Sequence, residues 1–289
     1  MSNKRVAITV DVEDWFQVEN LREHFPPEKW SVDLVRFKKP LSTLLDLLDK
    51  HGIRVTFFIL GWLAERFPET VKAISERGHE VASHGMSHRL NSQLSYEELN
   101  AELIESKQML EKITGNLVLG YRAPSFTISD TLLKALHQAD YLYDSSLFPF
   151  SKHQRYGRIS PESLKDAKKN GIIEFEIELG RFLGKQIPYA GGAYFRILPF
   201  WLIKRLLLNS ESKIIVMYFH PWEFDPDQPR VRGLSLGKKL RHLYGLRRNL
   251  QKVEKLICLC KSSGIGFITL AEAQKTIDQG IHWRNCLSR

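Results

Sequence analysis

Short runs of apolar, often β-branched residues alternate along the chain with longer segments whose leucines recur every three or four positions. The short runs predict β-strands, and the longer segments predict amphipathic helices. We expect strands at residues 5–11, 55–60, 80–83, 117–121, 141–143, 172–177, 214–219 and 267–269. We expect helices at residues 34–51, 63–77, 95–113, 129–139, 199–208, 246–263 and 270–278.

The repeated order of strand then helix predicts a parallel sheet covered by helices. About seven or eight such units in 289 residues suit an α/β fold with a closed or nearly closed barrel, and a doubly wound open sheet is the alternative. The first strand is not followed by G-x-G-x-x-G, which argues against a dinucleotide-binding fold. Residues 145–170 and 189–195 lack regular spacing, and we expect loops there.

Polar residues lie at the ends of five of the predicted strands. They are Asp11, His84, Arg122, Asp144 and His220. The carboxyl ends of the strands in a parallel barrel converge on one mouth, where catalytic residues lie. We therefore expect these side chains to meet in one pocket, although they are far apart in the chain.

Two histidines and a group of acids at this mouth predict a metal site. His84 and His88 are four positions apart, so one helical turn would point both imidazoles at the same ion. Asp11, Glu13 and Asp14 repel one another unless a cation or a base lies among them. Two histidines and one carboxylate leave a position open for water, as a catalytic zinc site requires.

Other residues at the mouth suit acid–base chemistry. Arg122 can orient a carboxylate and keep it ionised. His220 can act as a general acid because histidine titrates near neutral pH. Asp144 either holds such a histidine or caps a turn.

Three further residues are assigned to substrate binding. Trp222 either forms an apolar wall for a sugar ring or belongs to the core. Residues 189–195 form a glycine- and aromatic-rich loop whose Tyr194 can stack on a sugar, with a tight turn as the alternative. Pro124 closes the R-x-P motif that begins at Arg122.

Composition narrows the classes of protein. The chain is 43% hydrophobic and 26% charged, which is typical of a globular domain. No apolar run is long enough for a transmembrane helix, and the first residues lack the pattern of a signal peptide, so we expect a cytoplasmic protein. The three cysteines make no disulfide framework.

The net charge of +9 raises the question of an anionic partner. The aromatic-rich basic motifs of RNA-binding modules are absent, and we expect no nucleic-acid partner. Residues 230–248 contain basic but no acidic residues. This segment is either a solvated loop or a surface that attracts an anionic substrate or a membrane.

The order of these motifs over residues 5–275 resembles that of the polysaccharide deacetylases of carbohydrate esterase family 4, the NodB-homology proteins. The resemblance implies a distorted (β/α)7 barrel and a single domain over residues 1–289, with an extension from about residue 225. The D-V-E-D-W opening and this extension look most like the subgroup encoded with exopolysaccharide and exosortase genes.

The resemblance also implies roles for the residues at the mouth. Asp11 matches the catalytic base, His84 and His88 the metal-binding pair, Arg122 the arginine that tunes the base, and His220 the general acid. The fourth motif of the family falls at Asp144 only loosely.

The first motif departs from the adjacent aspartates of most of the family. Alternation along a strand places Asp11 and Glu13 on the same face. A loop that begins at Val12 would instead favour Asp14 as the residue beside the histidines. We favour Asp14 as the ligand because a shorter carboxylate holds its position more rigidly, and Glu13 is the alternative.

Together these features predict a metal-dependent hydrolase, with Zn²⁺ as the expected ion, that removes N-acetyl groups from an N-acetylhexosamine saccharide in free or lipid-linked form. Two alternatives are a hydrolase of another non-peptide C–N bond, such as an allantoinase-like enzyme, and a non-catalytic saccharide-binding barrel.

Overall fold

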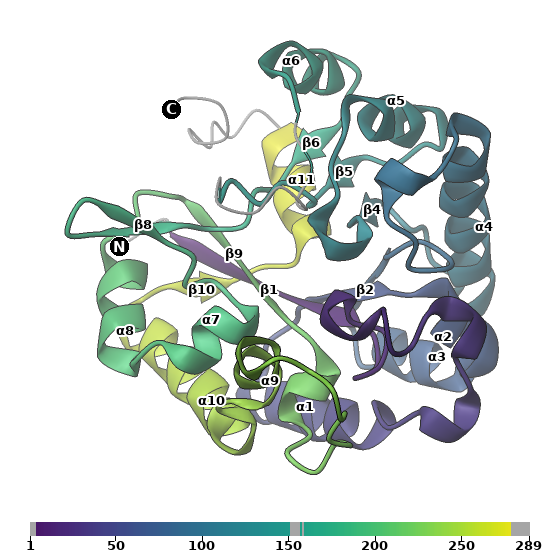
Figure 1. The fold of residues 1–289 in the computed structure, drawn as a ribbon. Coiled ribbons are helices and arrows are strands. Elements are labelled where there is room, and N and C mark those ends of the chain that lie inside the picture. Colours follow the sequence, from purple (N-terminus) through teal and green to yellow (C-terminus); the bar gives the residue numbers. More distant parts are fainter. Residues whose placement is uncertain (1–3, 151–156, 158, 279–289) are drawn as a thin grey trace.

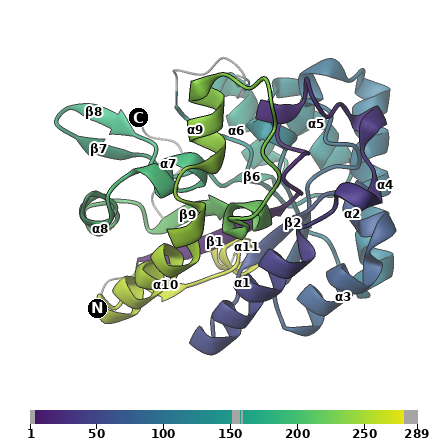
Figure 2. The same cartoon turned by 60° about the horizontal axis from the view of Figure 1, so that its bottom comes forward.

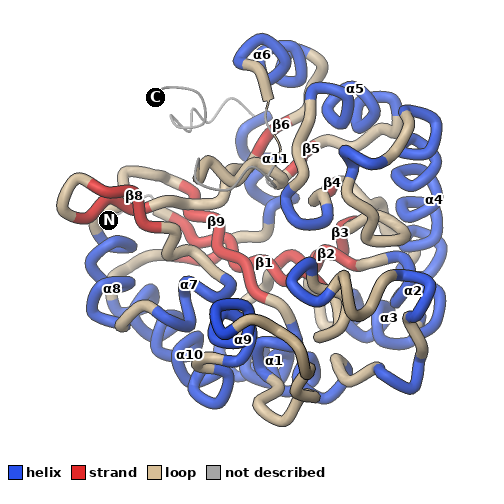
Figure 3. Tube along the Cα trace, in the orientation of Figure 1, coloured by secondary structure: helices blue, strands red, loops and turns tan. Residues whose placement is uncertain are grey.

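A computed structural model describes residues 4–150, 157 and 159–278 (Figure 1). Its centre is a parallel sheet, and the helices lie around the outside of that sheet, as Figure 3 shows. The strands follow the order β10-β1-β2-β3-β4-β5-β6, and β9 also pairs with β1.

The strands of the sheet are β1 (Arg5–Val12), β2 (Thr56–Ile59), β3 (Glu80–Ser83), β4 (Gly120–Tyr121), β5 (Tyr143–Asp144), β6 (Ile173–Glu174), β9 (Ile214–Phe219) and β10 (Gly266–Phe267). A separate antiparallel hairpin consists of β7 (Gly180–Phe182) and β8 (Lys185–Ile187). The helices are α1 (Lys38–His51), α2 (Gly61–Arg66), α3 (Pro68–Glu76), α4 (Tyr96–Thr114), α5 (Asp130–Gln138), α6 (Pro161–Lys169), α7 (Gly192–Ile197), α8 (Phe200–Leu208), α9 (Leu236–Leu243), α10 (Leu246–Ser262) and α11 (Leu270–Asp278). Within the described part of the chain, no helix has the length and apolar character needed to cross a membrane.

Strand β1 is the axis of the sheet. It is buried after Arg5, as expected for an apolar strand that is covered on both faces. It pairs with β2 near its carboxyl end and with β9 along most of its length, so segments from both ends of the chain lie beside it. An isolated parallel bridge from Ile177 to Val216 joins the segment after β6 to β9. The predicted α/β fold is confirmed, with a parallel sheet that curls into a partial barrel.

The core has two parts. The larger lies between the sheet and the surrounding helices and includes apolar residues from β1, β2, β9 and most helices. The smaller cluster centres on Trp15, Phe16 and Trp222, which come from the segments that follow β1 and β9. This second cluster packs the loops at the carboxyl ends of the strands, where the polar residues gather.

Strong local signals in the sequence correspond to elements of the structure. Ser95 caps α4, and its hydroxyl and the Glu98 carboxylate form the expected capping box. Gly115 ends the same helix in the left-handed conformation. The predicted helix 63–77 is instead two helices, because Pro68 begins α3 and the backbone of Phe67 is not helical.

Weak or short patterns do not reveal their elements. The expected loop 145–170 contains α6, which is mostly polar and is marked by its Ser160 cap and Pro161 rather than by periodicity. The expected loop 189–195 contains the start of α7, a helix too short to show an apolar period. Of the predicted extension 225–289, α9, α10, β10 and α11 are described, residues 279–289 lie outside the described part, and the domain boundaries stay a prediction.

One glycine positions the strand that leads to Arg122. Gly120 pairs with Tyr143 across β4 and β5, and an added Cβ would lie 1.8 Å from the Tyr143 ring. The ring cannot easily move, because it is fully buried and its hydroxyl donates to Glu80 Oε1 at 2.5 Å.

We therefore predict that Gly120→Ala lowers the free energy of unfolding by roughly 1–3 kcal/mol or more, as overpacking a core does. Gly237→Ala is the matched control, since its Cβ would meet nothing within 4 Å in α9. It should leave stability unchanged or slightly raised. Chemical denaturation measures both, and equal stability of the two variants would contradict the packing argument.

Candidate active site

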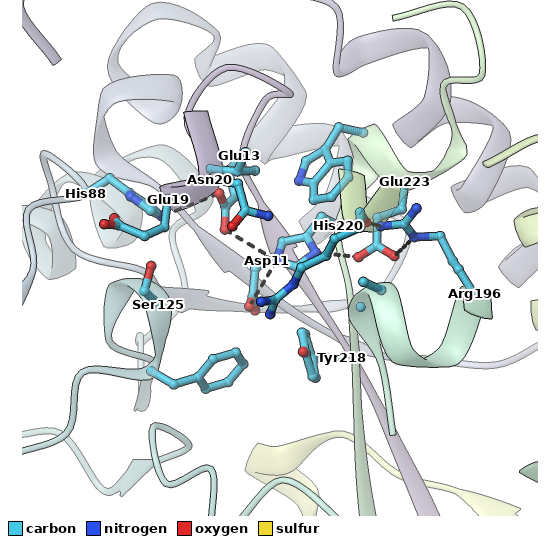
Figure 4. A pocket seen from close by; sticks show the side chains of 16 residues that line it. Asp11, Glu13, Glu19, Asn20, His88, Ser125, Arg196, Tyr218, His220 and Glu223 are labelled. Atoms are coloured by element: carbon cyan, nitrogen blue, oxygen red, sulfur yellow. Dashed lines mark hydrogen bonds and ion pairs between the residues drawn. The ribbon is translucent and has the colours of Figure 1, made fainter. Parts of the chain in front are cut away.

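The carboxyl ends of β1, β3, β4 and β9 place Asp11, His84, Arg122 and His220 around one mouth. A pocket there is lined by Asp11, Glu13, Val18, Glu19, Asn20, His88, Ser125, Phe126, Gly192, Ala193, Arg196, Tyr218, His220, Trp222, Glu223 and Arg241. Figure 4 shows Asp11 near its centre, with Glu13 and His88 to one side and His220, Glu223 and Arg196 to the other.

Glu13, His84 and His88 form a buried cluster with the composition of a metal site. Glu13 Oε1 lies 3.6 Å from His84 Nε2, and Glu13 Oε2 lies 3.4 Å from His88 Nε2. Neither Nε2 atom has a hydrogen-bond partner among the described residues. Burying such atoms without partners is costly, and a bound cation would satisfy them.

The orientation of His84 fits metal binding. Its Nδ1 lies 2.7 Å from the backbone carbonyl of Arg122, which can only accept a hydrogen bond. The proton is therefore on Nδ1, and the lone pair of Nε2 faces Glu13 and His88. A histidine ligand is commonly fixed in this way by a backbone carbonyl.

Asp14 does not join this cluster, contrary to the expectation that it is the ligand. Its carboxylate accepts hydrogen bonds from the backbone N–H groups of Trp15, Arg36 and Phe37, at 2.8, 2.6 and 3.0 Å. Strand β1 continues through Val12, so alternation places Glu13 on the face of Asp11. Asp14 instead ties this loop to the start of α1, and burial raises its pKa to about 6.

Asp11 is held by Arg122 in a fully buried ion pair. Arg122 Nη1 donates to Asp11 Oδ1 at 2.7 Å and to the Thr9 hydroxyl at 2.7 Å. The rest of the guanidinium donates to the carbonyl and hydroxyl of Ser145. The other oxygen of Asp11 lies 3.8 Å from His220 Nε2. The pair therefore orients one carboxylate oxygen toward the pocket.

His220 is fixed from behind by Glu223, an acid that the sequence reasoning missed. His220 Nδ1 lies 2.5 Å from Glu223 Oε1, and Glu223 Oε2 accepts from Arg196 Nε at 3.0 Å. Burial lowers the pKa of His220, but the charges of Glu13, Glu223 and Asp11 outweigh it and raise the pKa to about 9. A cation bound by Glu13 would offset part of this attraction.

Arg196 links His220 to the segment around α9. Besides Glu223, its guanidinium donates to the carbonyls of Arg241, His242 and Tyr244. The spacing of His220 and Glu223 in H-P-W-E, three positions apart, is the signal that could have identified Glu223. No comparable local signal identifies Arg196, because it comes from α7.

Asp144 neither contacts His220 nor belongs to the Glu13 cluster. Its Oδ1 accepts from the Ser146 hydroxyl at 2.6 Å, and β5 and β6 place it opposite Glu174. Burial raises the pKa of Asp144 to about 6 and raises that of Glu174 further. Of the two alternatives expected for Asp144, the one in which it holds the histidine is wrong, since Glu223 does so.

The three residues assigned to the substrate differ in position. Trp222 lines the pocket, but only 6% of it is exposed, and its ring stacks on His220 and His242. Pro124 is buried in a turn and does not line the pocket. Tyr194 does not line the pocket; its ring packs on Phe150, and the Arg241 guanidinium lies 5.7 Å from the ring centre.

Comparison with known proteins matches two parts of this chain to family models. Residues 33–143 match the model of the polysaccharide deacetylases, and residues 145–273 match a domain of unknown function, DUF3473. The peptidoglycan deacetylase-like protein FGM2 of Gibberella zeae is 38% identical over 109 residues, which is 37% of this chain and 32% of that protein. A peptidoglycan-N-acetylglucosamine deacetylase of Bacillus cereus is 34% identical over 98 residues, which is 34% of this chain and 46% of that protein. The matched parts span less than half the length of either relative.

Solved structures share the fold over the whole chain. A Mycobacterium smegmatis protein assigned to the polysaccharide deacetylases has a TM-score of 0.64 at 20% identity, with 100% of this chain and 94% of that chain covered. A carbohydrate esterase family 4 pseudoenzyme from Bacillus anthracis has a TM-score of 0.56 at 14% identity, with 95% and 66% covered.

The fold is therefore that of the NodB-like α/β deacetylases. Residues 33–143 match the model of the polysaccharide deacetylases, the family that the motifs predicted. Because a pseudoenzyme shares the fold, activity has to be judged from the side chains.

The buried ion pair between Arg196 and Glu223, which holds His220, leads to a stability prediction. Arg196→Met should lower the free energy of unfolding by about 3–5 kcal/mol, because the buried Glu223 carboxylate loses the guanidinium and keeps only His220 as a partner. Lys38→Met, which removes an exposed ion pair with Glu69, should cost at most about 1 kcal/mol. Urea denaturation compares the two, and similar small losses would show that Arg196 is not needed to hold Glu223.

Proposed function

We propose that this protein is a metal-dependent hydrolase that removes N-acetyl groups from N-acetylhexosamine residues of a poly- or oligosaccharide. The observation that carries the proposal is the position of Asp11 and His220 beside the Glu13, His84 and His88 cluster in one pocket. A base, an acid and a set of nitrogen and carboxylate donors within one mouth are the parts that hydrolysis of an amide requires.

Glu13, His84 and His88 are the residues that would hold the ion, and two imidazoles with one carboxylate suit Zn²⁺. When bound by these residues, such an ion would supply polarisation of the amide carbonyl and a lowered pKa for water. The ion pair with Arg122 aims the Asp11 carboxylate at the pocket, so Asp11 can take the proton of the attacking water.

His220 supplies the second proton transfer. Its Nε2 faces Asp11 and Glu13, while Glu223 holds the opposite ring nitrogen. A protonated His220 can therefore donate to the amine nitrogen as the C–N bond breaks, which releases acetate and a free amine. Glu223 and Arg196 are positioning residues in this proposal, because they act on the reaction only through His220.

A more specific part of the proposal concerns the kind of saccharide that the protein acts on. The relatives are named for peptidoglycan, whereas the D-V-E-D-W motif favours a saccharide of exopolysaccharide biosynthesis, in lipid-linked or nascent form. Arg241, on α9, lines the pocket and places a positive charge near its mouth. Such a charge would suit a substrate that carries phosphate or carboxylate groups.

The metal site can be tested with two neighbouring acids. Protein purified without chelator and without a His tag should contain about one transition-metal ion per chain by elemental analysis. Glu13→Gln should lose this metal, because its carboxylate lies between the two histidines. Asp14→Asn is the matched control and should keep it.

If Glu13→Gln keeps the metal and Asp14→Asn loses it, the carboxylate ligand would be Asp14 and not Glu13. A wild-type chain that binds no metal even when zinc is supplied would instead favour the saccharide-binding barrel.

The roles of base and acid predict large losses of activity in chains that still bind metal. His220→Ala should lower kcat by roughly 10²–10⁴-fold, the usual range for loss of a general acid, and Asp11→Asn should cost at least about 10²-fold. Acetate release from acetylated oligosaccharides is the measurement. Full activity of Asp11→Asn with unchanged metal content would refute the role of Asp11, and turnover of ureides without acetate would favour the allantoinase-like alternative.

A further inference from the structure

The turn between β7 and β8 contains a leucine at a position where a small or polar residue is expected. Leu183 has a φ of 49° and Gly184 a φ of 75°, so both residues of the turn are left-handed. Such turns favour asparagine, aspartate and glycine, and a leucine there is strained. Leu183 is also 85% exposed, so packing within the chain does not explain it. A strained and exposed apolar residue points to a function outside the fold.

The neighbouring helix α8 extends this apolar surface. Trp201 is 59% exposed, and Leu208 lies seven positions further along the same helix and is also exposed. The hairpin rests directly on α8, since the rings of Phe182 and Trp201 are 6.0 Å apart and edge to face. We call Phe182, Leu183, Trp201 and Leu208 the hairpin patch.

The charged residues of the hairpin and of α8 are all basic. Residues 179–210 contain no aspartate or glutamate, and Glu178 and Glu211 flank this segment. The exposed cations of this segment are Arg181, Lys185, Lys204 and Arg205, and Arg205 lies over the Phe182 ring at 5.9 Å. None of the four forms an ion pair with another described residue.

The hairpin patch also projects from the body of the molecule. The hairpin and α8 lie side by side at the same edge in Figure 1 and in Figure 2, and the turn is outermost in both views. A protruding tip can enter a soft surface, whereas a flat patch would suit a rigid protein partner.

We propose that the hairpin patch attaches the protein to an anionic lipid surface. Leu183 and Trp201 insert at the boundary between headgroups and acyl chains, where leucine and tryptophan are both favourable. The four cations lie at the level of the headgroups and are attracted by negatively charged lipid. A surface that is negative throughout matches a basic patch without acids better than a protein face of mixed charge does.

The test is co-sedimentation of the full chain with vesicles of phosphatidylcholine, or of phosphatidylcholine mixed with phosphatidylglycerol. The double variant Leu183→Gly, Trp201→Gln removes the apolar tip, and glycine relieves the left-handed strain, so the fold is not threatened. Leu117→Gln is the matched control, because Leu117 is 77% exposed and follows α4 by three residues. Helix α4 lies on the opposite side of the molecule from the hairpin in Figure 1.

The wild type should bind the mixed vesicles and not the neutral ones, and salt at about 1 M should abolish binding by screening. The double variant should bind at least about tenfold more weakly, and Leu117→Gln should bind as the wild type does. Three results would overturn the proposal. The double variant could bind as strongly as the wild type, the wild type could bind neutral and mixed vesicles equally, or the wild type could bind neither kind of vesicle. In the last case, loss of self-association in the double variant would identify a protein contact instead.

Discussion

The geometry of the mouth depends on one buried arginine. Arg122 donates from its guanidinium to Asp11 and Thr9 on β1 and to Ser145 after β5, and its own carbonyl accepts from His84. A buried guanidinium is tolerated only when its donors are satisfied, so these partners are held at fixed distances. The orientation of the proposed base and that of one proposed metal ligand are therefore set by the same residue.

Convergence of the strand ends is predictable from sequence because it follows from topology. Once the apolar runs alternate with helical segments, a parallel arrangement places the carboxyl ends of the strands together, whatever the separation along the chain. This alternation is sufficient to predict that Asp11, His84, Arg122 and His220 meet at one mouth. The same reasoning also assigns Asp144 to the mouth, but its side chain turns toward Glu174, because a strand end defines the position of a residue and not the direction of its side chain.

Details that depend on a single residue of register or on tertiary partners are not predictable in this way. Whether Glu13 or Asp14 faces the histidines depends on whether β1 ends before or after Val12, and apolar periodicity does not locate a strand end that closely. The residues next to Arg196 in the sequence give no sign that it belongs to the site. Arg196 reaches Glu223 only because α7 packs beside the segment after β9, and this packing depends on the tertiary fold.

The position of β1 between β2 and β9 has a consequence for the order in which the protein forms. The Thr9 hydroxyl donates to the carbonyl of Met217, 208 positions later in the chain. During synthesis one edge of the first strand therefore stays without its partner until most of the chain has emerged, and contacts of such long separation form slowly. A ribosome-bound chain that lacks β9 already holds Asp11, His84 and Arg122 but has no His220, so the mouth cannot form until the segment that follows β9 has also been synthesised.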